Sequence, residues 1–100
     1  MKAYRIHDWQ SEPKLDDVPI PEPGPGEVLI KIAGAGVCSS DLHLSEEWSP
    51  ETMPYLAEWK MPFTLGHENG GWIEEGDANL ETGTPVVVNC LWHCGHCRPC

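Results

Sequence analysis

Proline and glycine occur so often along this chain that few stretches can form a helix. Ten prolines and ten glycines are present in 100 residues, and both residue types mark turns. Between them lie short runs that alternate apolar and polar residues or are dense in β-forming residues, which favours strands. We predict strands over Lys2–His7, Glu27–Val37, Trp72–Glu74 and Pro85–Asn89. The sequence therefore predicts one mostly β domain over residues 1–100.

The connections between these strands follow the same logic. The stretch PIPEPGPGE (residues 19–27) predicts a rigid loop that joins the first two strands, because its prolines exclude a helix. A short helix is predicted after Cys38, because residues 39–41 (SSD) are good N-cap residues, and it cannot extend past Pro50. Residues 48–62 contain three prolines and show no clear period, so we expect a surface loop there.

The charge of the chain limits its partners. Sixteen acidic and six basic residues give a formal net charge of −10, which offers phosphates no basic surface, so we expect no nucleic-acid partner and no membrane partner. The first ten residues, MKAYRIHDWQ, lack the apolar segment of a signal peptide. No apolar run approaches the roughly 18 to 20 residues that span a bilayer. We therefore expect a cytoplasmic protein.

A cluster of cysteines lies at the C-terminal end of the chain. Three thiols there are spaced as Cys-x2-Cys-x2-Cys: Cys94, Cys97 and Cys100. In a reducing cytosol this spacing is more typical of a tetrahedral zinc site than of disulfides. The fourth ligand would be Cys90 or a residue beyond Cys100, and His93 and His96 are further possible donors. An iron–sulfur cluster would need similar ligands, but the ferredoxin spacing differs.

A second set of candidate ligands lies upstream. The stretches GVCSSDLH (residues 36–43) and GHENGG (residues 66–71) contribute Cys38 and His67, whose thiolate and imidazole suit zinc. Taken separately, each signal is weak, because a lone buried cysteine is most often a small apolar residue and a lone histidine is usually structural or exposed.

The order of the motifs is more specific. The succession GPGEVLIKIAGAGVCSSDLH, FTLGHENGG and CGHCRPC closely resembles the zinc-dependent medium-chain alcohol dehydrogenase family, over nearly the whole chain. The resemblance implies a GroES-like, partly open β-barrel with short helices. In family members a Rossmann domain that binds NAD or NADP follows. The glycine-rich stretches at 24–26 and 34–36 lack the helix and the spacing of a pyrophosphate site, so no cofactor-binding residue is assigned in this chain.

The resemblance also implies roles for individual residues. Cys38 and His67 would bind a catalytic zinc, and Glu68 would sit beside the metal and approach it. Ser40 would hydrogen-bond the substrate oxygen and His43 would pass the proton to solvent, although Ser40 can also be a helix cap and His43 an exposed helix residue. Cys94, Cys97 and Cys100 would hold a separate structural zinc. Its fourth cysteine would follow shortly after, so the chain is expected to be truncated, with Cys90 as a spare thiol.

This ligand set leads to an expected reaction. Zinc held by thiolate and imidazole keeps an open position and acts as a Lewis acid on an alcohol oxygen, while the nicotinamide accepts the hydride. We expect NAD(P)-dependent oxidation of a primary or secondary alcohol to an aldehyde or ketone by a longer chain that is homo-oligomeric, with these 100 residues inactive alone. The alternatives are a polyol, threonine or glutathione-linked formaldehyde dehydrogenase, or a free-standing GroES-like zinc-binding module that catalyses nothing.

Overall fold

Two separate antiparallel sheets form the framework of the computed structural model, which describes residues 1–77, 79–90 and 96–98. The first sheet has the strand order β2-β1-β4 and contains β1 (Lys2–Ile6), β2 (Lys14–Asp17) and β4 (Phe63–Thr64). The second has the order β3-β5-β6 and contains β3 (Leu29–Gly36), β5 (Glu68–Glu75) and β6 (Pro85–Val87). The sheets do not close into one barrel, and helical structure in the described part is short. The predicted mostly β, partly open architecture is confirmed.

The first sheet is built around β1. Ala3 and Ile6 of this strand are buried, and Lys2 pairs with Asp17 at the strand end, where the Lys2 Nζ atom is 2.6 Å from the Asp17 Oδ2 atom. Strand β2 is not predicted from the sequence, because its residues KLDD contain few β-formers. The loop containing residues 19–27 therefore joins β2 to β3, and its predicted position between the first two strands was wrong.

The second sheet carries the motif residues. Strand β3 pairs with β5 in a register that sets Gly36 opposite Glu68. Strand β5 is longer than the predicted strand over residues 72–74, because the GHENGG motif runs directly into it. Three of the first four residues of β5 are Asn69, Gly70 and Gly71, which are poor strand formers in isolation, so pairing on both sides must stabilise them.

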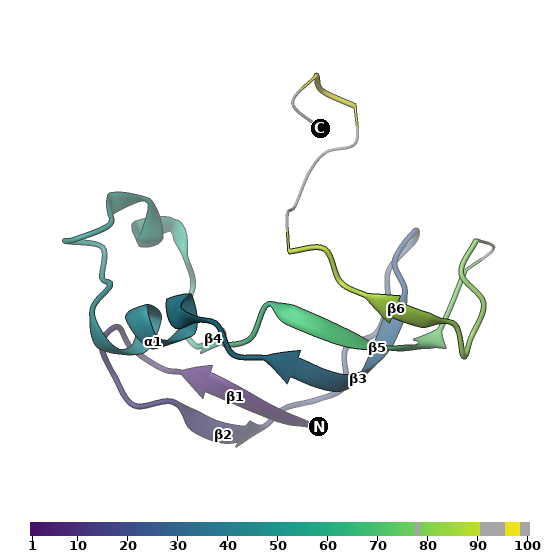
Figure 1. Cartoon of the computed structure of the whole chain (residues 1–100), viewed down its shortest axis with the longest axis horizontal. Helices are drawn as coiled ribbons and strands as arrows, with labels where there is room; N and C mark the ends of the chain where they lie inside the picture. The colour runs from purple at the N-terminus through teal and green to yellow at the C-terminus, as the bar shows by residue number, and fades with distance from the viewer. Residues whose placement is uncertain (78, 91–95, 99–100) are drawn as a thin grey trace.

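Helical turns and the main core lie at one end of the sheets. Helix α1 (Ser39–Glu46) ends before Pro50 as predicted, but its N-cap is Cys38 rather than one of the serines that follow. Figure 1 shows α1 beside β4 at this end. Ile6, Leu44 and Leu56 form the buried cluster, against which Trp48, Phe63 and other partly buried side chains pack.

The segment over residues 48–62 is not only a surface loop, as predicted, but also contributes to the core. It contains the 3-10 helix η1 (Pro54–Glu58), and Leu56 in that helix is only 1% exposed. A single inward-facing residue in one short turn leaves no periodic pattern in the sequence, which explains the error. In the part of the chain that the structure describes, no helix has the length and apolar character needed to cross a membrane.

Candidate metal site and adjoining cleft

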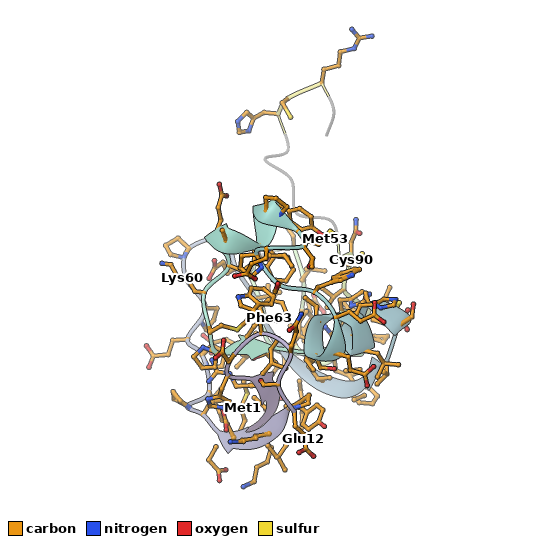
Figure 2. All side chains as sticks on the ribbon, turned by 90° about the vertical axis from the view of Figure 1, so that its left-hand side faces the viewer. Met1, Glu12, Met53, Lys60, Phe63 and Cys90 are labelled. Atoms are coloured by element: carbon orange, nitrogen blue, oxygen red, sulfur yellow. The ribbon has the colours of Figure 1, made fainter. Side chains whose placement is uncertain are left out.

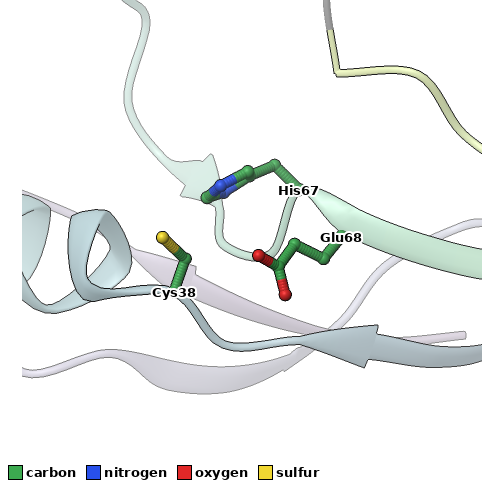
Figure 3. A group of neighbouring side chains, drawn as sticks. All are labelled: Cys38, His67 and Glu68. Atoms are coloured by element: carbon green, nitrogen blue, oxygen red, sulfur yellow. The ribbon is translucent and has the colours of Figure 1, made fainter.

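Three potential metal ligands converge where β3 meets α1 and where β5 begins. The sulfur of Cys38, a ring nitrogen of His67 and a carboxylate oxygen of Glu68 all lie within 4.8 Å of one another. Figure 3 shows the three side chains directed toward a common point. Cys38 and His67 are half-buried, whereas Glu68 is exposed. Thiolate, imidazole and carboxylate are all donors found in zinc sites, so this arrangement can hold that metal.

The turn before β5 sets the position of His67. Gly66 has a φ of +94°, and a Cβ atom on it would lie 3.3 Å from Ala35 Cβ. A side chain at this position would be strained by its backbone conformation, so glycine is required. The sharp turn places His67 opposite Cys38, although 28 residues separate them in the printed sequence, from position 39 to position 66.

A buried carboxylate joins the two loops that carry these ligands. Asp41 is 6% exposed. Its Oδ2 atom accepts a hydrogen bond from the Cys38 backbone N–H at 2.9 Å, and its Oδ1 atom accepts one from the Gly66 backbone N–H at 3.1 Å. The same Oδ1 atom lies 3.7 Å from His67 Nδ1. Asp41 therefore fixes both ligand-bearing loops relative to each other.

From the sequence alone, Asp41 is expected only as a helix-capping residue. The available signal was its place three residues after Cys38, where an acidic side chain can reach back to the backbone at the start of a helix. Nothing local indicated the second bond, because Gly66 lies 25 residues further along the chain.

Local hydrogen bonds prepare the Cys38 thiol for metal binding. Its pKa lies below the ordinary value, chiefly because the Ser40 backbone N–H and then the Ser40 hydroxyl donate to the thiolate, with Ser39 contributing less. A hydrogen bond from His67 also lowers the pKa of Cys38, while partial burial acts in the opposite direction. The thiolate, which is the form that binds metals, is favoured.

The two residues of the predicted proton relay lie in different surroundings. Ser40 lines a cleft together with His67. His43 is not among the described residues that line this cleft; its Nδ1 atom is 3.0 Å from Glu47 Oε2, and its ring stacks on Trp48 at 5.2 Å between centroids. Of these two residues, the structure therefore brings only Ser40 to the lining of the cleft beside the candidate site.

The second predicted metal site falls largely outside the described residues. Cys94 and Cys100 are not among them, and neither is His93. Cys97 is exposed, and Cys90 is exposed at the edge of the cleft. The structural zinc site thus stays a prediction.

The two open sheets define a mostly β domain, and the thiol, imidazole and carboxylate at the second sheet form its candidate metal site. The sequence profile described as "Alcohol dehydrogenase GroES-like domain" matches residues 24–100, and the chain belongs to this family. The family predicted from the sequence motifs is confirmed.

Named relatives agree with this assignment. The chain is 42% identical to an L-threonine 3-dehydrogenase of Xanthomonas oryzae pv. oryzae and 40% identical to an NAD-dependent alcohol dehydrogenase of Sulfurisphaera tokodaii. These matches include 100% of this chain but only 29% and 30% of the two relatives. A cobalt- and zinc-bound thermostable alcohol dehydrogenase of Pyrobaculum aerophilum is similar in structure, with a TM-score of 0.80 and 35% identity over 100% of this chain and 30% of that one.

Proposed function

We propose that this chain is the metal- and substrate-binding domain of an NAD(P)-dependent, zinc-dependent alcohol dehydrogenase. The observation that carries the proposal is the convergence of Cys38, His67 and Glu68 beside a cleft. The relatives support it, since one is named as NAD-dependent and a structural neighbour as zinc-bound. Because the chain spans about 30% of these proteins, the nicotinamide site would belong to a further part of a longer protein.

The donor set fits zinc. Cys38 has a lowered thiol pKa and faces an imidazole, and both belong to the ligand types of catalytic zinc sites. Cys38 and His67 would hold the ion, with Glu68 able to approach it. When bound, zinc supplies Lewis-acid activation of an alcohol oxygen.

The remaining chemistry belongs to side chains around the cleft. The Ser40 hydroxyl would accept a hydrogen bond from the substrate hydroxyl and orient it, since Ser40 and His67 line the same cleft. Ser40 would pass the proton released by the substrate hydroxyl to His43, three residues further along α1 and 39% exposed at its side chain, and His43 would pass it to water. The substrate would be a primary or secondary alcohol and the product an aldehyde or ketone, and a nicotinamide bound elsewhere in the longer protein would supply the hydride acceptor.

The other expectations belong to this same proposal. Cys94, Cys97 and Cys100, with one further ligand, would hold a structural zinc. The whole protein would be a cytoplasmic homo-oligomer that binds small alcohols and neither nucleic acid nor membranes. Oxidation of L-threonine is a second candidate reaction, because the Xanthomonas enzyme is 42% identical to this chain.

Zinc content and turnover of the full-length protein test the proposal together. His67→Ala should abolish alcohol oxidation and lower the zinc content, because a catalytic ligand is lost. His7→Ala is a matched control, since His7 is a surface histidine that directly follows β1 and is bonded to Asp16 of β2 at 2.8 Å, in the sheet region that does not carry the site residues. Full activity and undiminished zinc in His67→Ala would contradict the proposed site.

A further inference from the structure

The cleft beside the candidate metal site has a volume of about 810 Å³. Ser40 and His67 contribute to its lining, and three large aromatic side chains contribute as well: Trp48, Trp59 and Phe63. In the view of Figure 2, Phe63 lies between Lys60 and Cys90, which also line the cleft. The volume lies within the range of about 300 to 1,000 Å³ that small-molecule sites occupy.

The aromatic lining is held in place by other rings. The Trp59 ring centroid lies 4.7 Å from that of Phe63 and 6.5 Å from that of Trp9. On another part of the lining, Trp48 stacks on His43 with an angle of 17° between the ring planes. Trp9, Trp48 and Phe63 also pack against the buried cluster. These contacts restrict the rings before any substrate binds, which reduces the ordering that binding requires.

We propose that Trp59 is a specificity-determining residue and that the cleft selects alcohols with an aromatic or branched apolar group of about phenyl size. This inference rests on the proposed dehydrogenase function. A phenyl group would remove apolar surface from water and meet indole rings at favourable aromatic distances. Ethanol has far less apolar surface to bury against these rings, so it would gain less from them.

An amino-acid alcohol such as L-threonine fits the cleft less well. Its ammonium group would need a carboxylate partner, and Asp41 is the only carboxylate among the described residues that line the cleft; both of its oxygens already accept backbone hydrogen bonds. Its carboxylate could approach Lys60, which is exposed and therefore remains hydrated. Burying either charge without a close partner is costly.

Steady-state kinetics of the full-length protein with benzyl alcohol, ethanol and L-threonine test the inference. We expect kcat/KM for benzyl alcohol to exceed that for ethanol by about 10-fold or more, since small apolar differences change specificity by roughly 10- to 200-fold. Trp59→Ala should reduce this ratio by about 10-fold, whereas Trp59→Phe, which keeps a ring, should preserve most of it. Tyr55→Ala is the matched control, because Tyr55 is an exposed aromatic residue of η1 outside the described lining of the cleft.

The outcomes separate this inference from the proposed function. Two results would overturn the role of Trp59 but leave the proposed dehydrogenase function intact. The first is turnover of ethanol with no preference for benzyl alcohol. The second is a preference for benzyl alcohol that neither Trp59→Ala nor Trp59→Phe reduces. A higher kcat/KM for L-threonine than for benzyl alcohol would also overturn the inference and would favour recognition by Lys60. Absence of turnover with all three compounds would remove the proposed function and the inference with it.

Discussion

Gly36 and Glu68 face each other across β3 and β5, and a Cβ atom on Gly36 would lie 2.9 Å from Glu68 Cβ. It would approach a carboxylate oxygen of Glu68 more closely still. Real Cβ atoms essentially never have such contacts, so a side chain at position 36 would displace Glu68. The missing side chain of Gly36 therefore leaves the space in which the carboxylate turns toward Cys38 and His67.

Gly36→Ala should weaken zinc binding at the candidate site by about 10-fold, because the displaced carboxylate no longer supports the metal. Competition with a chromogenic chelator measures the affinity, in a background in which Cys94, Cys97 and Cys100 are replaced by serine. Gly34→Ala is the control, since Gly34 lies on the same strand and a Cβ atom there meets nothing within 4 Å. Equal zinc affinities of Gly36→Ala and Gly34→Ala would refute the displacement of Glu68 as the explanation. A loss of zinc affinity that Gly36→Ala also causes in a Glu68→Ala background would refute it as well.

Asp41→Ala should lower the free energy of unfolding by about 1 to 3 kcal/mol, because two backbone N–H groups lose a buried acceptor. Urea unfolding measures this change. Asp77→Ala provides a matched comparison, since Asp77 also accepts two backbone N–H bonds, from Asn79 and Leu80, but is exposed to water. A loss in Asp41→Ala no larger than that in Asp77→Ala would show that the bridge between the loops contributes little.

The lowered pKa of Cys38 predicts thiol reactivity at unusually low pH in the zinc-free protein. A depressed folded-state pKa means that the reactive thiolate persists to a lower pH than in the unfolded chain. Iodoacetamide alkylation across a pH series, with the other cysteines replaced by serine, should give a midpoint below that of the same protein in urea. Ser40→Ala should raise the folded-state midpoint, since the Ser40 hydroxyl stabilises the thiolate. Coincident midpoints in the folded and unfolded states would contradict this prediction.

Leu56→Ala should destabilise the fold by about 2 to 5 kcal/mol, as is usual when a buried leucine is truncated. Leu42→Ala is the control, because Leu42 is 54% exposed on α1. Thermal or urea unfolding measures the stability of both variants. Similar small losses in the free energy of unfolding for Leu56→Ala and Leu42→Ala would show that the segment around η1 is not part of the core.

Short stretches of sequence predict some parts of this fold and of the candidate site, and fail to predict others. The strands around Lys2 and Leu29 and the helix after Cys38 follow from short-range composition. His67 and Glu68 became candidate ligands only through the order of motifs that resembles the family. Strand β2 was missed because its residues KLDD contain few β-formers. The burial of Leu56 and the second hydrogen bond of Asp41 depend on partners far away in the sequence, and a short window holds no trace of those partners.

The bridge formed by Asp41 has a consequence for how an ion would enter this site. The Asp41 carboxylate holds the loop of Cys38 against the loop of Gly66 through protein hydrogen bonds alone. The ligands are therefore assembled while the chain folds, so the entropy of bringing them together is already lost before an ion arrives. An ion would then bind to a preorganised site, and its loss should leave the surrounding backbone in place.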